Sequence, residues 1–333
     1  MLNFLLSTVL VTIGGGSGDA ETSNLKFKQV KKWDINLPSE SWTEIEHLIP
    51  IGSGFAVNNT EFKLEIDTNA DSRPDSDIKG SGGFALLRGK REDGSKYSYA
   101  IRVRPTGSTW EYACAGLMST KVNGVNIALI DQNNNGIWNE VGVDALIIGK
   151  GSAASYLSEV VNLDGELFNL SASETGETIS ITPFEGESGF LNVVEAYNSK
   201  AKLTSAVFTS ADSKYSFELS ASSKGMQVPA GKYQLTRGSV NKGVEYATIR
   251  RGSMKAIEIE GGKTKELNWG GPLRIEFDTE RTDAETITVR LPSFYGNADE
   301  EYFDFLPGGK SPTIVATDNK TGKEIWSGKF CEG

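Results

Sequence analysis

Apolar and polar residues alternate with a period of two along most of the chain, in short runs separated by Gly, Asn, Asp and Ser. This pattern is typical of β-strands joined by tight turns. Five pairs of such runs flank a short turn and predict β-hairpins: 84–88 with 97–104, 201–210 with 215–220, 256–260 with 264–269, 273–278 with 286–291, and 313–317 with 324–328. A helical period is not sustained anywhere, and at most a short helix fits 153–161.

The hydrophobic pattern therefore predicts an all-β protein. We expect two or three antiparallel β-sandwich or partly open barrel units, because strands without intervening helices cannot build a doubly wound α/β fold. The expected units are an N-terminal β domain at 24–184, a middle β-sandwich module at 185–265 and a C-terminal β unit at 266–333, which opens with a Gly-Gly-Pro turn.

The first twenty residues differ from the rest. Residues 2–13 are almost all apolar, which is too short a run to span a bilayer but matches the hydrophobic region of a signal peptide. Gly18 and Ala20 are small residues at the spacing that signal peptidase prefers. We interpret 1–20 as a signal peptide cleaved after Ala20, with a buried N-terminal strand as the alternative. The mature chain is then exported, to the periplasm, the cell surface or the medium, and has no transmembrane segment.

Charge and composition exclude several classes of function. The formal net charge is −10 and no long basic run occurs, so nucleic acid is not an expected partner. The only histidine is His47, which removes most sites that need several imidazoles. Two cysteines, Cys114 and Cys331, cannot make a four-ligand zinc site. They form either one disulfide or two unpaired thiols.

Two acidic loops are the candidate metal sites. The first reads IDTNADSRPDSDIKG, and its candidate ligands are Asp67, Asn69, Asp71, the carbonyl of Arg73, Asp75 and Asp77. Calcium requires six to eight hard oxygen ligands, which side chains at positions 1, 3, 5 and 9 and a carbonyl at position 7 can supply. Closely spaced carboxylates repel one another without a cation.

The second loop reads LIDQNNNGIWNEVGVDALIIG. Its candidate ligands are Asp131, Asn133, Asn135, the carbonyl of Ile137, Asn139, Glu140 and Asp144. The first six positions match D-x-[DN]-x-[DN]-G, with Gly136 at the sharp turn. The twelfth position is Gly142 where a bidentate Glu is expected, so Glu140 or Asp144 has to replace it.

These loops resemble the calcium loops of EF-hands and dockerins, and the first also resembles thrombospondin type 3 repeats. Their flanking segments look like strands, so we expect calcium-type loops between strands rather than helix–loop–helix sensors. The alternative is a pair of metal-free turns, because Asn, Asp and Gly favour turns in any case. Few anionic ligands predict weak, structural calcium.

Longer phrases resemble one family. The IDTNAD loop, IDQNNNGIWNEVGVDALIIG, YLSEVVNLDGELF and KSPTIVATDNKTGKE together resemble exported β-rich proteins of environmental bacteria such as planctomycetes. That resemblance implies export but no activity. Separately, VPAGKYQL at 228–235 resembles carboxypeptidase-regulatory-like modules and implies a β-sandwich in the middle unit.

Two functions remain. The first is an exported, non-catalytic binding or cell-envelope protein that holds a glycan or a cell-surface protein, with some of its tryptophans as sugar platforms: Trp33, Trp42, Trp110, Trp138, Trp269 and Trp326. The alternative is that the tryptophans are core residues, since Trp is highly buried on average. The alternative is an extracellular, glycoside hydrolase-like enzyme with a carboxylate pair drawn from Asp299, Glu300, Glu301 and Asp304.

Overall fold

The computed structural model describes residues 20–60, 62–283, 286–307 and 313–329. In these ranges the chain is built mainly of antiparallel strand pairs and contains no helix, which confirms the predicted all-β class. No helix in the described ranges is long and apolar enough to cross a membrane. The expected signal peptide at 1–20 lies, except for Ala20, outside the described residues.

The strands form three groups along the chain. The N-terminal sheets contain β1 (Glu21–Asn24), β2 (Lys26–Gln29), β11 (Gly116–Val122), β12 (Val125–Ile130), β13 (Ala145–Ile148), β14 (Ser155–Tyr156), β15 (Val160–Leu163), β16 (Glu166–Ala172) and β17 (Thr178–Pro183). A lobe between β2 and β11 contains β3 (Thr43–Ile45), β4 (Leu48–Ile49), β5 (Phe55–Thr60), β6 (Lys63–Ile66), β7 (Ser76–Lys79), β8 (Gly83–Lys90), β9 (Lys96–Thr106) and β10 (Thr109–Cys114).

The remaining strands follow β17. They are β18 (Ser188–Asn192), β19 (Tyr197–Asn198), β20 (Lys202–Ser210), β21 (Ser216–Glu218), β22 (Met226–Pro229), β23 (Gly231–Lys242), β24 (Glu245–Arg250), β25 (Ile257–Ile259), β26 (Thr264–Glu266), β27 (Trp269–Gly270), β28 (Arg274–Glu276), β29 (Thr279–Arg281), β30 (Ile287–Val289), β31 (Ser293–Tyr295), β32 (Glu301–Leu306), β33 (Thr313–Thr317) and β34 (Glu324–Lys329).

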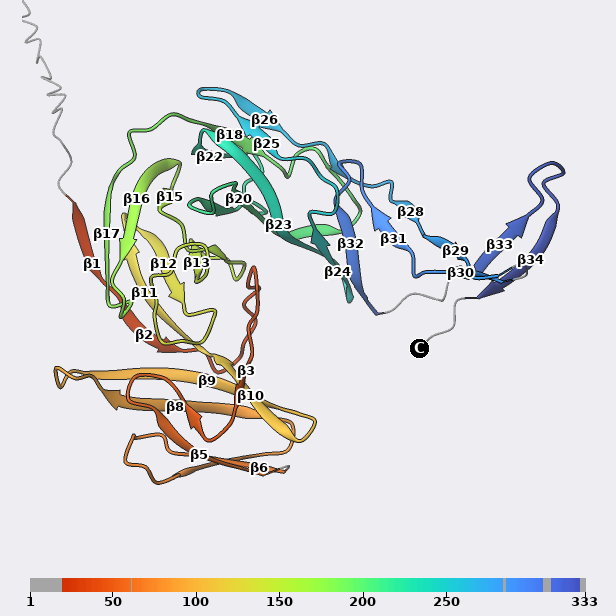
Figure 1. The fold of residues 1–333 in the computed structure, drawn as a ribbon. Coiled ribbons are helices and arrows are strands. Elements are labelled where there is room, and N and C mark those ends of the chain that lie inside the picture. Colours follow the sequence, from red (N-terminus) through yellow and green to blue (C-terminus); the bar gives the residue numbers. More distant parts are fainter. Residues whose placement is uncertain (1–19, 61, 284–285, 308–312, 330–333) are drawn as a thin grey trace, which may run out of the picture.

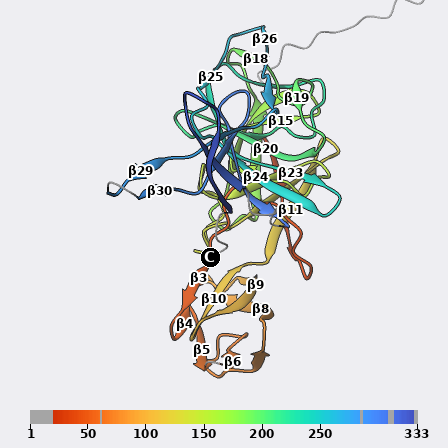
Figure 2. The same ribbon diagram turned by 90° about the vertical axis from the view of Figure 1, so that its right-hand side faces the viewer.

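The lobe formed by β3 to β10 projects from the N-terminal sheets. Strands β2 and β11, which enter and leave it, pair with each other antiparallel, with Phe27 opposite Met118. Figures 1 and 2 show the lobe at the bottom of the molecule, below the sheets that contain β11 and β12. The lobe nevertheless shares one apolar core with those sheets, which runs from Leu25 to Ile181. Residues of this shared core therefore border the space between the lobe and the sheets.

A second apolar core runs from Val160 to Tyr302. It is organised by an eight-stranded sheet in which β24 pairs with β32. Strand β26 also returns to pair parallel with β18. The boundary expected at residues 265 and 266 therefore falls inside shared sheets. Beyond β32, the strands β33 and β34 form a separate two-stranded arm, which Figure 1 shows at the far right.

Three of the five predicted hairpins are confirmed: β8 with β9, β20 with β21, and β33 with β34. The other two pairings were wrong. Strand β25 pairs with β23, and β26 with β18, because the buried Ile257 and Ile259 pack into the second core beside β23. Strand β28 pairs with β31 instead of with the segment at 286–291. The possible helix at 153–161 is replaced by β14 and the start of β15.

Cys114 is buried in the first core, and burial raises the pKa of its thiol to about 12. Its Sγ lies 3.4 Å from the carbonyl oxygen of Gly116. Cys331 lies outside the described residues, and the predicted choice between a disulfide and two thiols stays a prediction.

Candidate metal centre

The two acidic loops occupy equivalent places in two three-stranded meanders. The first joins β6 to β7 after the hairpin of β5 and β6, and the second joins β12 to β13 after the hairpin of β11 and β12. Their backbones also turn alike. The fourth and sixth positions have positive φ in both loops, at Ala70 (61°) and Ser72 (67°) in the first and at Asn134 (65°) and Gly136 (83°) in the second. The two loops therefore share one backbone conformation at these positions.

Asp131 organises the second loop. Its carboxylate is fully buried and accepts hydrogen bonds from the N–H groups of Asn134 (2.7 Å), Asn135 (3.3 Å) and Gly136 (2.6 Å). The hydroxyl of Tyr99 donates a fourth bond, of 2.7 Å. Burial raises the pKa of Asp131 to about 6, against these four bonds, which favour the charged form.

Three side chains of the second loop converge on one point. The amide nitrogens of Asn133 and Asn135 lie 2.8 Å and 2.6 Å from Oε2 of Glu140. The buried Oδ1 of Asn133 has no hydrogen-bond partner. A buried polar atom without a partner is costly, and most such atoms in native proteins are satisfied by protein, water or an ion. The side-chain amides at the third and fifth positions of the loop thus donate to the carboxylate at the tenth, and Oδ1 of Asn133 stays without a partner.

Asp144 adds a second buried carboxylate to the same loop. It accepts N–H groups from Gln132 (3.3 Å) and Glu140 (2.9 Å) and is fully buried. Burial, together with the nearby charge of Asp131, raises the pKa of Asp144 to about 8. None of Asp131, Glu140 and Asp144 forms an ion pair with a described residue. Buried carboxylates that lack a cation normally neutralise or bind a metal.

One predicted ligand of the second loop, the side chain of Asn139, makes its contact outside the loop. The amide of Asn139 is directed at the carbonyl of Ala172 on β16, at 3.4 Å. Ile137 donates its N–H to Oδ1 of Asn135 at 2.8 Å. Asp131, Asn133, Asn135, Glu140 and Asp144 therefore remain the candidate ligands of the second loop, with the Ile137 carbonyl in the same turn.

Sequence reasoning missed Asn134, which anchors the second loop in the core. Its side chain accepts the N–H of Cys114 (2.7 Å) and donates to the carbonyl of Ser41 (3.0 Å), and its carbonyl accepts the hydroxyl of Tyr112 (3.0 Å). The signal was the run of three Asn before Gly136, in which only the first and third fit the metal pattern. The middle Asn holds the loop against the lobe.

The first loop is arranged around Asp67 in a similar way. This buried carboxylate accepts the N–H groups of Asn69 (3.0 Å), Asp71 (3.4 Å) and Ser72 (2.8 Å). Asp75 closes the loop from the other side, since it accepts the N–H and the hydroxyl of Thr68 at 2.9 Å and 2.8 Å. The carboxylates of the loop thus have donors within the loop itself.

The remaining predicted ligands of the first loop face water or other residues. Asn69 donates to Oδ2 of Asp75 at 3.0 Å, and Oδ1 of Asp71 accepts the N–H of Arg73 at 2.9 Å. All four of these residues are exposed. Asp77 lies on β7, and its carboxylate pairs with the ammonium of Lys63 at 3.1 Å, away from the loop. The structure therefore separates Asp77 from the other five predicted ligands.

The second loop differs from the first in three features of its side chains. It combines an orphaned amide oxygen, two buried carboxylates and a third carboxylate without an ion pair. Within the described ranges, no cluster of three or more His, Cys, Asp or Glu side chains is arranged to hold a metal on its own. The donors of the second loop include amide and carbonyl oxygens, which suit calcium rather than zinc.

Three of the four candidate acidic residues near the C-terminus form hydrogen bonds or ion pairs with other groups of the chain. Glu300 is fully buried and accepts the N–H of Gly270 at 2.6 Å. Glu301 forms a bidentate pair with Arg250, and Asp299 pairs with Arg274 at 3.0 Å. Asp304 is exposed. The geometry required for a glycosidase, two facing carboxyl groups with room for a sugar, has no support from these contacts.

The tryptophans divide between the cores and the surface. Trp110, Trp138 and Trp269 are buried, whereas Trp326 on the terminal arm is 55% exposed. The half-buried Trp33 and Trp42 stack on guanidinium groups, at 4.2 Å and 4.7 Å from that of Arg102. Half of the candidate sugar platforms are therefore core residues.

Comparison with protein-family models, curated proteins and solved structures found no match. The geometry of the second loop and the sequence phrases given above are thus the grounds for a functional conclusion.

Proposed function

We propose that this chain is an exported, non-catalytic β protein of the cell envelope, cell surface or medium, whose second acidic loop binds a structural calcium ion. The single observation that supports the metal is the convergence of Asn133 and Asn135 on Glu140, with the Oδ1 atom of Asn133 unpartnered. The apolar run at 2–13 followed by Gly18 and Ala20 supports export.

The ligands in this proposal come from one hairpin connection. The side chains of Asp131, Asn133, Asn135, Glu140 and Asp144 supply oxygens, together with the carbonyl of Ile137. The bound ion supplies positive charge that neutralises the buried carboxylates, and it ties β12 to β13. The role is structural, since no step of a reaction is needed to explain these residues.

The expected affinity is low. Only one of the first five positions is anionic, and calcium sites of extracellular modules bind with dissociation constants on the order of 10⁻⁴–10⁻³ M. Such a site is a structural staple filled by external calcium, and not a switch.

The test is thermal unfolding of the full chain in EDTA and then in 10 mM calcium. Binding in the expected range stabilises the folded state by about 1.4–2.7 kcal/mol at this concentration. That gain corresponds to a melting temperature about 3–10 °C higher. Magnesium at the same concentration is the control, because it prefers a smaller and stricter octahedral site. An unchanged melting temperature at 10 mM calcium would refute the staple.

A further inference from the structure

Strand β28 is the last strand at one end of the eight-stranded sheet. It pairs antiparallel with β31, and no other described strand pairs with it. Within the described ranges, no backbone N–H or carbonyl of residues 273–277 bonds to an element other than β31. Figure 1 shows β28 beside β31, on the side away from β32. The outer edge of β28 therefore offers backbone donors and acceptors to a further strand.

The apolar face of β28 continues the second core beyond its last buried residue. Ile275 lies opposite Phe294, which lies opposite Tyr302 on β32, so the three side chains share one face of the sheet. Tyr302 is buried and Phe294 is half-buried, whereas Ile275 is 57% exposed. Leu273 and Phe277, which flank the strand, are exposed as well. An exposed apolar strip at a free strand edge is a site for pairing with another chain.

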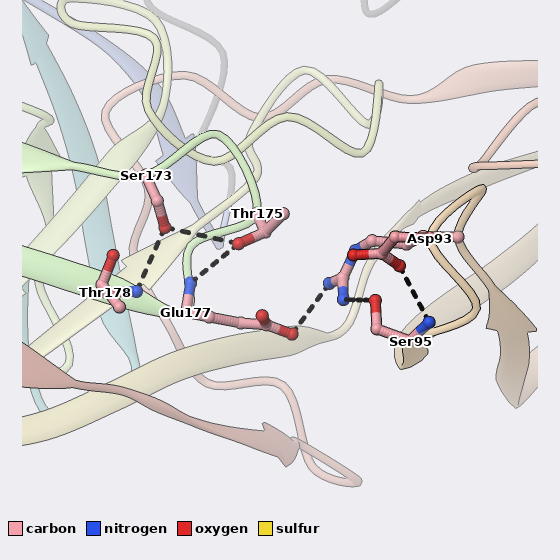
Figure 3. A network of polar contacts seen from close by, with 7 residues as sticks. Asp93, Ser95, Ser173, Thr175, Glu177 and Thr178 are labelled. Atoms are coloured by element: carbon pink, nitrogen blue, oxygen red, sulfur yellow. Dashed lines mark hydrogen bonds and ion pairs between the residues drawn. The ribbon is translucent and has the colours of Figure 1, made fainter.

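The edge of a second sheet is covered within the chain. Strand β8 ends the sheet of β3, β10, β9 and β8, but the N–H of Arg88 donates to the carbonyl of Thr68 at 2.8 Å. The turn after β8 is also held, since Arg91 donates to Oε1 of Glu177 at 2.8 Å. Figure 3 shows the turn of the β8–β9 hairpin facing the turn that contains Glu177. In addition, β8 exposes Arg88 and Lys90, whose like charges repel a second copy of the same strand.

The two charged side chains of β28 have opposite signs and stand on either side of Ile275. Arg274 and Glu276 are half-exposed and contact each other at 2.6 Å. Arg274 also contacts Asp299 at 3.0 Å. If a two-fold axis passes through an antiparallel pair of β28 strands at Ile275, Arg274 of each copy lies directly opposite Glu276 of the other. Opposite charges attract across two strands, so this charge pattern is complementary to itself.

We propose that two copies of this chain associate through β28, paired antiparallel about Ile275, so that their eight-stranded sheets join into one continuous sheet. The same axis brings Leu273 of one copy beside Phe277 of the other, and covers the strip that each copy exposes alone. Because β28 has three residues, the contact belongs to the class of small, weak interfaces, below about 1,200 Å². We expect a concentration-dependent dimer. The contact lies outside both acidic loops and does not rest on calcium.

Sedimentation equilibrium of the full chain, from about 1 μM to about 500 μM, tests this proposal. The dimer fraction of the parent should rise with concentration. Glu276→Lys places a cation opposite Arg274 of the other copy, and should raise the dissociation constant at least tenfold. Arg274→Glu should do the same, because it places an anion opposite Glu276. The matched control is Glu258→Lys on β25, an ion-paired Glu of similar exposure, which should change the constant less than twofold.

Two further samples test the register of the pairing. The double variant Arg274→Glu, Glu276→Lys restores opposite charges across the axis and should regain the dimer. A 1:1 mixture of the two single variants should form a heterodimer, because every charged pair across its strands joins a cation to an anion. Circular dichroism checks that each variant keeps its sheets.

Three results would overturn the proposal. The first is a parent that stays monomeric up to about 500 μM. The second is a dimer that Glu276→Lys weakens no more than Glu258→Lys does. The third is a mixture of the two single variants that associates no better than either variant alone.

Discussion

The two acidic loops share a backbone but differ in what surrounds their carboxylates. Both carry positive φ at the fourth and sixth positions, and both begin with a buried Asp that accepts N–H groups from its own turn. In the first loop the remaining acids are exposed to water. In the second loop, Asp144 is also buried, and Glu140 accepts hydrogen bonds from the side-chain amides of Asn133 and Asn135. The two loops therefore share their turn geometry and differ in the burial of their carboxylates.

The largest difference is expected on removing the first acid of each loop. Asp131→Ala leaves the hydroxyl of the buried Tyr99 and three N–H groups without their acceptor, and should lower the free energy of unfolding by about 3–5 kcal/mol. Asp67→Ala should cost about 1–3 kcal/mol, because water reaches the exposed N–H groups of Asn69 and Asp71. Urea unfolding in EDTA measures both. Equal losses would contradict the distinction between the loops.

The pH dependence of stability should reflect Asp144. Its pKa is about 8 in the folded chain against about 3.9 for an unperturbed Asp. Between these values the folded state holds the extra proton, so without calcium the free energy of unfolding falls as the pH rises from about 4 to about 8. Each group contributes at most about 1.4 kcal/mol per pH unit, and Asp131, with a pKa of about 6, adds to the slope only below about pH 6.

Asp144→Asn should flatten this slope, and Asp75→Asn in the first loop should leave it in place. Saturating calcium should also reduce the slope, because the ion favours the deprotonated carboxylate. Urea unfolding at intervals between pH 6.5 and 8, above the pKa of about 6 of Asp131, checks all three statements. A slope that persists in Asp144→Asn would assign it to another group.

Calcium affinity should fall when the charge of Glu140 is removed and stay unchanged when that of Asp77 is removed. Glu140→Gln keeps an oxygen near Asn133 and Asn135 but removes the negative charge, and should raise the dissociation constant about tenfold, which is about 1.4 kcal/mol. Asp77→Asn is the matched variant, since its carboxylate pairs with Lys63 outside the first loop. Its calcium response should equal that of the parent. Fluorescence-monitored calcium titration measures both constants.

The smallest effects concern the sixth position. Gly136→Ala places a Cβ at a φ of +83°, and should cost about 1 kcal/mol through backbone strain. Ser72→Gly relieves a φ of +67° at the equivalent position of the first loop, and should stabilise it by a few tenths of a kcal/mol up to about 0.5 kcal/mol. Thermal unfolding of both variants in EDTA shows whether Gly136→Ala lowers stability and Ser72→Gly raises it. A stabilising Gly136→Ala would mean that the turn does not need its glycine.

Period-two alternation and turn residues predicted the all-β class, and three of five hairpins, because those features are local. The pairing of β25 with β23 and of β26 with β18 was not predictable in this way, since partners distant in sequence are chosen by core packing. For the candidate metal centre, the alternate spacing identified Asn133 and Asn135, whose amides donate to Glu140. The separation of Asn139 and Asp77 from their loops depends on contacts with Ala172 and Lys63, which no loop pattern contains.

The most direct measurement of the central claim is a calcium titration followed by amide NMR on the isotopically labelled full chain. The N–H of Gly136 donates to the carboxylate of Asp131 and so reports on the second loop alone. We predict that its resonance shifts with calcium and saturates with a midpoint on the order of 10⁻⁴–10⁻³ M, while that of Ser72 moves little. An unmoved Gly136 resonance at 10 mM calcium, or a shift confined to Ser72, would contradict the assignment of the calcium site to the second loop.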